Sequence, residues 1–263
     1  MDKEAILNEV TAFITYQGDR VFRNWAQFDI AKIAVDNVDV TTNFDIEIER
    51  EFYELVSKKF PEHGFVGEEL HELNKDAELK WHIDPIDGTK YFAQGIPLWG
   101  ITLALVQNET PILGLIYNPT TKQLYRAAKG LGAYLNDSKL QFKSGIETSK
   151  LQLALDLTTR KYDWDNLQDR LGEIVSQLMK DYYRVRMFGN GAYALAWLAQ
   201  GMFGVYVDPY RHTDKFVDIA AGIIIAEEAG ASYERINLGD SMEQIVVANH
   251  RLIDDLKKTI SLK

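Results

Sequence analysis

Short apolar segments follow one another between residues 98 and 137, and they constrain the fold more than any other stretch of the sequence. Predicted strands are Leu98 to Val106, Ile112 to Tyr117 and Leu124 to Ala128, with a last hairpin around Asn136 and Asp137. Only short turns separate them, whereas parallel neighbours need a crossover connection of a dozen or more residues. The sequence therefore predicts an antiparallel meander in the first half of the chain.

Helical patterns precede this meander. Apolar residues at helical spacing predict a helix over residues 4 to 17, and residues 20 to 38 are interpreted as the end of a second helix followed by a loop. A further amphipathic helix contains Asp45 in its first turn, and Pro61 lies just beyond its end. On the sequence alone, Asp45 is either a capping residue or a functional acid.

The second half of the chain mixes strands with helices. Polar residues 143 to 150 separate the two halves, so we expect an N-terminal part of residues 1–145 and a C-terminal part of residues 146–263. Asn190 is placed to cap a helix. Strands are predicted at residues 151–157, 184–188, 205–207, 231–236 and 245–248, and helices at residues 167–178, 191–200 and 218–228, with another at the C-terminus.

Composition excludes several classes of function. The absence of cysteine rules out disulfides and thiolate metal sites, and five His against 39 Asp and Glu favour oxygen ligands and hard cations such as Mg²⁺. The net charge of −10 argues against a nucleic-acid partner. No apolar run approaches the ~20 residues of a membrane helix. Residues 1–10 lack the apolar core of a signal peptide, so we expect a cytoplasmic protein.

The segment from Asp84 to Thr89 carries the strongest chemical signal. Asp84 and Asp87 lie three residues apart, and Gly88 and Thr89 can present backbone N–H groups to an anion at a helix start. A divalent cation between these groups would suit phosphate chemistry. The same spacing also fits a solvated Asp-Pro and Asp-Gly turn. Two residues separate the aspartates, which excludes the motif of haloacid-dehalogenase-type phosphatases and leaves water as the expected nucleophile.

Three motifs together resemble the inositol monophosphatase family. They are Gly67-Glu68-Glu69, the segment from Asp84 to Thr89 followed by Phe92, and Asp218-Ile219-Ala220-Ala221-Gly222. Residues 95–102, 114–119, 129–133 and 227–230 match as well, so that the resemblance covers nearly the whole chain in order. It implies a mixed α+β and α/β fold, layered as an αβαβα sandwich. It also implies Li⁺-sensitive hydrolysis of phosphate monoesters with two or three Mg²⁺ ions.

The resemblance also implies roles for individual residues. Thr89 and Glu68 match the pair that positions and deprotonates the attacking water, with Asp45 linked to Thr89. Glu69 is expected to support these groups without binding metal. The family's Mg²⁺ ligands correspond to Glu68, Asp84, the Ile86 carbonyl, Asp87 and Asp218, its phosphate-binding turn to Gly88 and Thr89, and its substrate contacts to Asp87, Asn190, Gly191 and Asp208.

Departures from the family pattern leave the substrate open. Val217 replaces the usual Trp before Asp218, and Asp208 precedes Asp218 by ten residues, a longer gap than in the animal inositol enzymes. The intervening segment, Tyr210 to Lys215, either contacts a different leaving group or is an ordinary polar loop.

Several functions remain open at this stage. The expected substrate is an inositol monophosphate or a related sugar phosphate, and the alternatives are fructose-1,6-bisphosphate, a 3′-phosphoadenosine nucleotide and NADP. A different class of function is a regulatory role as a partner of RNA polymerase or another protein. Relatives are often dimers, so a homodimer is expected.

Overall fold

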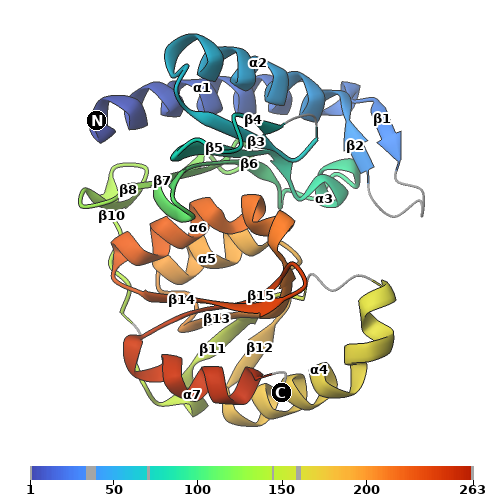
Figure 1. Cartoon of the computed structure of the whole chain (residues 1–263), viewed down its shortest axis with the longest axis vertical. Coiled ribbons are helices and arrows are strands. Elements are labelled where there is room, and N and C mark those ends of the chain that lie inside the picture. The colour runs from blue at the N-terminus through green and yellow to red at the C-terminus, as the bar shows by residue number, and fades with distance from the viewer. Residues whose placement is uncertain (1, 34–39, 70–71, 144, 158–160, 262–263) are drawn as a thin grey trace.

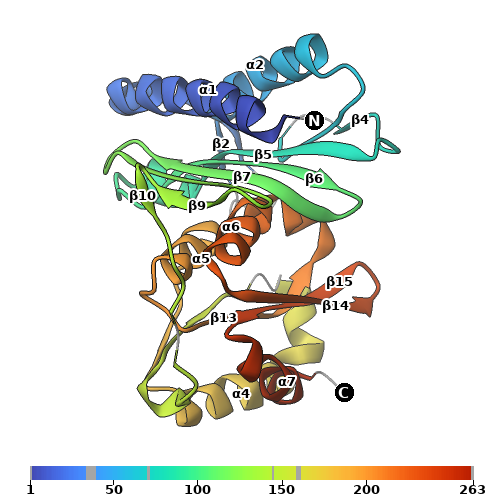
Figure 2. The same ribbon diagram turned by 90° about the vertical axis from the view of Figure 1, so that its left-hand side faces the viewer.

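Five layers of secondary structure stack along the long axis of the molecule, in the order helices, sheet, helices, sheet, helices (Figures 1 and 2). This arrangement confirms the predicted αβαβα sandwich. The computed structural model describes residues 2–33, 40–69, 72–143, 145–157 and 161–261. Within these residues, no helix combines the length and the apolar character needed to span a bilayer.

The first two layers come from the N-terminal half of the chain. Helices α1 (Lys3–Arg23) and α2 (Asn43–Lys59) cover the outer face of an eight-stranded sheet with the order β10-β9-β8-β7-β6-β5-β3-β4. From β5 to β10 every neighbouring pair is antiparallel, which confirms the predicted meander. The strands are β3 (Gly64–Gly67), β4 (Glu72–Leu73), β5 (Leu79–Asp87), β6 (Gly100–Gln107), β7 (Thr110–Asn118), β8 (Gln123–Ala128), β9 (Gly132–Leu135) and β10 (Ser138–Lys139).

The remaining three layers come mostly from the C-terminal half. Helices α5 (Gly191–Ala199) and α6 (Phe216–Ala229) lie between the two sheets, and α4 (Lys161–Asp181) and α7 (His250–Ile260) cover the far face of the second sheet. That five-stranded sheet has the order β12-β11-β13-β15-β14. Its strands are β11 (Gln152–Leu155), β12 (Arg184–Arg186), β13 (Val205–His212), β14 (Ser232–Gly239) and β15 (Met242–Ala248).

Short elements join these layers. A small antiparallel pair, β1 (Ile30–Ile33) and β2 (Val40–Thr42), precedes α2, and the short helix α3 (Thr89–Ala93) follows β5. Three 3₁₀ turns complete the described elements: η1 (Trp25–Gln27), η2 (Thr148–Lys150) and η3 (Thr213–Lys215).

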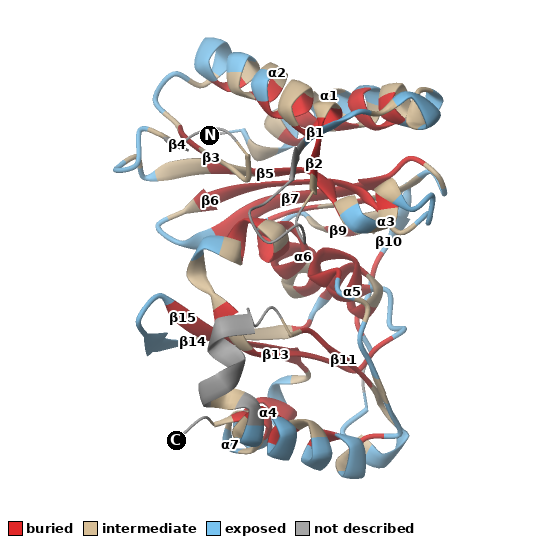
Figure 3. Cartoon of the chain, turned by 90° about the vertical axis from the view of Figure 1, so that its right-hand side faces the viewer, coloured by how far each residue is buried: buried red, intermediate tan, exposed pale blue. Residues whose placement is uncertain are grey.

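The hydrophobic core divides according to these layers (Figure 3). Alternate residues of a strand face opposite sides, so Tyr206 packs on the middle helices while Val205 and Val207 pack on the outer pair. Helix α6 is apolar around nearly its whole circumference because both sheets bury it. The middle helices share one core with both sheets. The division of the chain after residue 145 therefore stays a prediction, although each sheet lies on its own side of it.

Two predicted boundaries are wrong. Residues 20–23 belong to α1 and not to a second helix, because Gly18 packs against the Tyr117 ring and Val21 continues the buried face of the same helix. Residues 34–38 of that prediction lie outside the described residues. Strand β13 also continues to His212, so the predicted polar loop from Tyr210 to Lys215 consists entirely of strand and η3.

Candidate active site

The end of β3 is held in place by a buried carboxylate from α2. Glu49 is 1% exposed, and its Oε2 accepts a hydrogen bond of 2.8 Å from the backbone N–H of Glu69. A Cβ at position 67 would lie 2.0 Å from Glu49 Oε1, so only glycine permits this approach. The contact fixes the main chain on both sides of Glu68. The Glu69 side chain, in turn, accepts from the Thr41 hydroxyl at 2.9 Å, which fits its expected supporting role.

The segment from Asp84 to Thr89 forms the bulged end of a strand and not an isolated turn. In the pairing of β5 with β6, Asp84 opposes Thr102 and Asp87 opposes Gly100, so two residues of β5 face one of β6. Proline removes a backbone donor and is tolerated at such a bulge. The bulge turns the two carboxylates of β5 towards the same end of the sheet.

Local hydrogen bonds and glycine geometry fix the rest of this segment. The Asp84 Oδ1 accepts from the Ile86 N–H at 3.0 Å, and the Thr89 hydroxyl donates to the Ile86 carbonyl at 2.8 Å. Gly88 has φ +86° and caps α3, a left-handed conformation that favours glycine. The Thr89 backbone N–H consequently lies at the first position of the short helix.

Three predicted metal ligands converge from three different elements. Glu68 follows β3, Asp84 lies on β5 and Asp218 lies in the first turn of α6, and one carboxylate oxygen from each lies within 4.8 Å of the others. Asp87 is outside this group of three, although its side chain is buried next to it. We call Glu68, Asp84 and Asp218 the acid cluster.

The electrostatics of these acids favour a bound cation. Burial, together with the neighbouring charges of Glu68 and Asp218, raises the pKa of Asp84 and of Asp87 well above the usual range. Asp87 Oδ2 and Asp218 Oδ1 are buried without a hydrogen-bond partner. Unpartnered carboxylate oxygens of this kind are hard ligands that suit Mg²⁺. The residues present therefore fit the metal that the sequence predicts.

Two cations that the sequence did not assign to the metal site lie against the acid cluster. Lys215 Nζ contacts Glu68 Oε1 at 2.9 Å, and Arg211 Nη1 lies 3.8 Å from Asp218 Oδ2. Burial lowers the pKa of Lys215, but the charges of Asp218 and Glu68 outweigh it and raise that pKa above its ordinary value. These two side chains neutralise part of the charge of the cluster.

Arg211 is the centre of a buried ion network. Its side chain is 1% exposed, its Nε lies 3.0 Å from Asp208 Oδ2 and its Nη2 lies 3.6 Å from Asp156 Oδ2. The pairing of β13 with β15 shifts register between Asp208 and Arg211, which brings the two side chains to the same side of the strand. Arg211 is therefore an internal counter-ion for these carboxylates.

Asp45 acts as a helix cap in this structure. Its Oδ2 accepts from the Thr42 N–H at 2.7 Å and from the Thr42 hydroxyl at 2.5 Å, which completes a capping box. No direct hydrogen bond joins Asp45 to Thr89, whose hydroxyl donates to Ile86. The catalytic link between Asp45 and Thr89 stays a prediction.

Asp45→Asn should change how stability depends on pH. Burial raises the pKa of Asp45 from 3.8 to about 7, although the Thr42 hydrogen bonds oppose this. Between these values the folded state holds a proton that the unfolded chain releases. The stability that Asp45 contributes is therefore complete below the unfolded pKa and is lost as the pH rises through about 7.

Urea unfolding of the metal-free protein at pH 5 and pH 8 measures this effect. Asparagine does not titrate. From pH 5 to pH 8 the free energy of unfolding of Asp45→Asn should therefore rise, relative to that of the parent protein, by on the order of 3 kcal/mol. The exposed Asp254→Asn serves as a control and should leave the pH dependence unchanged. An equal difference between Asp45→Asn and parent at both pH values would contradict the assignment.

The predicted substrate contacts have different surroundings. Asn190 caps α5 through its Oδ1, while its Nδ2 is buried without a partner and lies beside Gly88, where an added Cβ would be 3.1 Å away. Position 191 favours glycine because an added Cβ would lie 2.7 Å from Asp156 Oδ2. Asp208 is fully buried against Arg211, so it has no exposed oxygen for a substrate. Of the three, Asn190 is the residue with a buried polar side-chain atom that has no protein partner.

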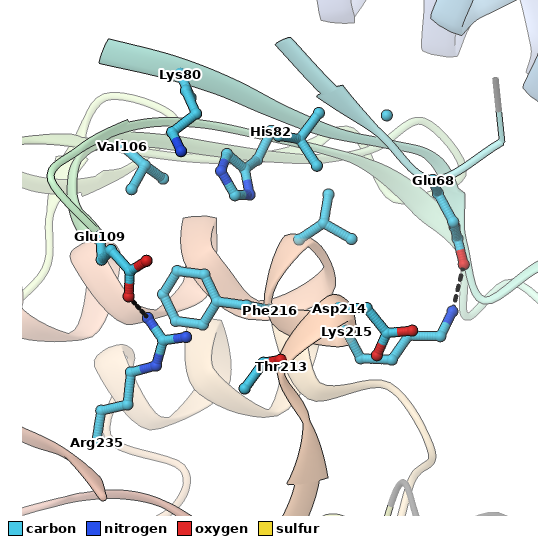
Figure 4. A pocket seen from close by; sticks show the side chains of 13 residues that line it. Glu68, Lys80, His82, Val106, Glu109, Thr213, Asp214, Lys215, Phe216 and Arg235 are labelled. Atoms are coloured by element: carbon cyan, nitrogen blue, oxygen red, sulfur yellow. Dashed lines mark hydrogen bonds and ion pairs between the residues drawn. The ribbon is translucent and has the colours of Figure 1, made fainter. Parts of the chain in front are cut away.

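A cavity of about 500 Å³ lies beside the acid cluster (Figure 4). It shares Glu68 and Lys215 with the cluster and extends under β5 and β6 towards the start of α6. Asp84, Asp87 and Asp218 do not line it. The Lys215–Glu68 ion pair therefore lies at the boundary between the cavity and the cluster.

Sequence reasoning did not assign Glu49 or Asp156 to the site, and it considered Arg211 and Lys215 only as part of the polar segment from Tyr210 to Lys215. Weak signals existed for two of them. Glu49 lies four residues after Asp45 beside an apolar helix face, and Asp156 interrupts an otherwise apolar strand pattern. Nothing local indicates that Lys215 meets Glu68, since 147 residues separate them.

This chain is similar to known proteins over nearly its whole length. The family described as the inositol monophosphatase family matches residues 3–260. A fructose-1,6-bisphosphatase/inositol-1-monophosphatase of Aquifex aeolicus is 30% identical, over 94% of this chain and 92% of that protein. A Nus factor SuhB of Haemophilus influenzae is 28% identical, over 92% of this chain and 91% of that protein. The structure of an Anabaena inositol monophosphatase matches with a TM-score of 0.81 and 26% identity, over 99% of this chain and 96% of that one.

Proposed function

Because the chain belongs to the inositol monophosphatase family of phosphoric monoester hydrolases, we propose that it hydrolyses a small phosphate monoester with Mg²⁺. The favoured substrate is an inositol monophosphate or a related sugar phosphate. One observation carries the proposal: carboxylates of Glu68 after β3, Asp84 on β5 and Asp218 on α6 converge within 4.8 Å, beside buried carboxylate oxygens that have no protein partner.

The proposed ligand set would hold two or three Mg²⁺ ions. Glu68, Asp84, Asp87 and Asp218 would contribute carboxylate oxygens, and the Ile86 carbonyl would contribute a backbone oxygen. That carbonyl accepts one hydrogen bond from Thr89 and keeps a second lone pair. Bound Mg²⁺ would lower the pKa of a water molecule and neutralise the charge of the phosphate.

Individual residues of the chain would have separate roles in the reaction. The backbone N–H groups of Gly88 and Thr89 would hold phosphoryl oxygens, and the Thr89 hydroxyl would orient the attacking water. Glu68 would accept the proton of that water as its oxygen bonds to phosphorus and the phosphorus–oxygen bond to the alcohol breaks. The departing alkoxide takes up a proton from solvent, Glu68 returns its proton to solvent, and no phospho-enzyme forms. Asp45 would support the Thr89 hydroxyl.

Asn190 is the substrate contact with the strongest support. Its buried Nδ2 is a donor without a partner beside Gly88, where it can reach an oxygen of the bound ester. Asp208 is left out of the proposal because Arg211 already neutralises it. Gly191 contributes by letting Asp156 approach.

Phosphate release tests the proposal directly. With inositol-1-phosphate and Mg²⁺ we expect turnover that EDTA abolishes and Li⁺ inhibits. The same assay on fructose-1,6-bisphosphate, a 3′-phosphoadenosine nucleotide and NADP identifies the leaving alcohol by the ratio of kcat/KM values. Absence of Mg²⁺-dependent release from every one of these esters would contradict the proposal.

A regulatory function is the second candidate. It is favoured by the similarity to a protein named Nus factor SuhB. A pull-down with a catalytically inactive variant tests whether a protein partner binds independently of catalysis. We also propose a homodimer, which light scattering on the purified protein can test.

A further inference from the structure

Lys215 places a positive charge against the acid cluster. It is the last residue of η3, and its side chain extends towards the end of β3, where Nζ contacts Glu68 Oε1 at 2.9 Å (Figure 4). Glu68 is one of the three acids whose oxygens lie within 4.8 Å of one another. In the metal-free protein, the ammonium therefore offsets repulsion between carboxylates that would otherwise face each other with no cation.

The main chain at Lys215 is fixed, whereas its side chain reaches partly into solvent. Arg211 Nη1 donates to the Lys215 carbonyl at 2.9 Å, and Arg211 is itself buried in its ion network. The Lys215 side chain is 29% exposed and ends in a compact charge on four rotatable methylenes. The ammonium can thus change position while its backbone stays in place.

The neighbouring cavity offers a position away from the cluster. Lys215 and Glu68 both line the cavity of about 500 Å³ (Figure 4). Asp214 lines this cavity beside Lys215. Glu109, in contrast, lines its other side and pairs with Arg235. A rotation of the Lys215 side chain into this space would free Glu68 Oε1 without moving the main chain. The released ammonium would remain near the carboxylate of Asp214.

We propose that Lys215 is a tethered cation that binds Glu68 when the metal site is empty and must withdraw before a divalent ion can use that oxygen. Lys215 then sets the metal affinity of the site, because each binding event breaks the Lys215–Glu68 pair. The inference rests on the proposed function only in assuming that the acid cluster binds Mg²⁺.

Lys215→Met tests the inference without measuring catalysis. Titration calorimetry of Mg²⁺ into the metal-free protein should show roughly three- to tenfold tighter binding, because removal of a competing ion pair shifts binding by about 1 kcal/mol. Thermal unfolding without metal should occur at a lower temperature, and the Mg²⁺-induced rise in Tm should be larger than in the parent protein.

Two controls separate this effect from a general loss of charge. Lys215→Arg keeps a cation at the position and should bind Mg²⁺ within about twofold of the parent protein. Lys122→Met removes a lysine from the exposed pair with Asp19 and should leave Mg²⁺ affinity unchanged. Equal or weaker Mg²⁺ binding by Lys215→Met overturns the inference while the metal site stands. If neither parent nor variant binds Mg²⁺, the proposed metal site fails and the inference fails with it.

Discussion

Asp84→Asn should lower Mg²⁺-dependent phosphate release by roughly three orders of magnitude, since it removes charge from a ligand at the centre of the proposed metal site. Asparagine retains an Oδ1 that can accept the Ile86 N–H, so the bulge of β5 should persist. Initial rates at saturating substrate with increasing Mg²⁺ measure the effect. They separate a weaker metal affinity, which higher Mg²⁺ restores, from a lower kcat.

Stability distinguishes this loss from unfolding. Burial and the charges of Glu68 and Asp87 oppose ionisation of Asp84, so the neutral side chain should raise the Tm of the metal-free protein. The matched control is Asp137→Asn, an exposed acid in the β9–β10 turn, which should keep full activity. A variant at position 84 that retains more than a tenth of the parent activity would remove Asp84 from the metal site.

Arg211→Met should destabilise the fold by about 3–5 kcal/mol, because it leaves buried carboxylates without their counter-ion. Asp208 is fully buried, and Asp156 is 6% exposed. For a chain of 263 residues this corresponds to a fall in Tm of roughly 10 °C. Chemical denaturation, followed by circular dichroism, measures the change.

A double-mutant cycle assigns the loss to the ion pair. The double variant Arg211→Met/Asp208→Asn should lose much less stability than the two single variants lose together. The reason is that the double variant no longer buries the uncompensated charge of Asp208. The exposed Arg184→Met is the control for loss of an arginine and should change stability by less than about 0.5 kcal/mol. If Arg211→Met costs less than 1 kcal/mol, Arg211 is not the counter-ion of this network.

Much of the fold could be predicted because its signals are local. The meander between β6 and β10 follows from apolar segments separated by short turns, and the Asn190 cap follows from the start of a helical pattern. The family resemblance placed Glu68, Asp84 and Asp218 in one site, and the structure brings these three together. Sequence spacing alone left the aspartate pair of β5 undecided between a solvated turn and a metal site.

The remainder depends on contacts between distant residues. Position 18 of helix α1 is glycine because the Tyr117 ring occupies the space of a side chain there, and sequence periodicity contains no such information. Strand β13 continues to His212 because β15 pairs with it across a bulge, which turns Arg211 inwards. A polar segment of this kind looks like a surface loop until its pairing partner is known.

The position of α6 has a consequence for the order of folding. This helix carries Asp218 and packs between the sheets. Asp84 lies in the first sheet, and Glu68 follows one of its strands. Asp84 and Asp218 are 134 residues apart in the sequence. The cation site is therefore complete only after the middle helices have docked. If this docking follows the transition state of folding, a bound ion should slow unfolding with little effect on the folding rate. Mg²⁺ would thereby lengthen the lifetime of the assembled protein without accelerating its assembly.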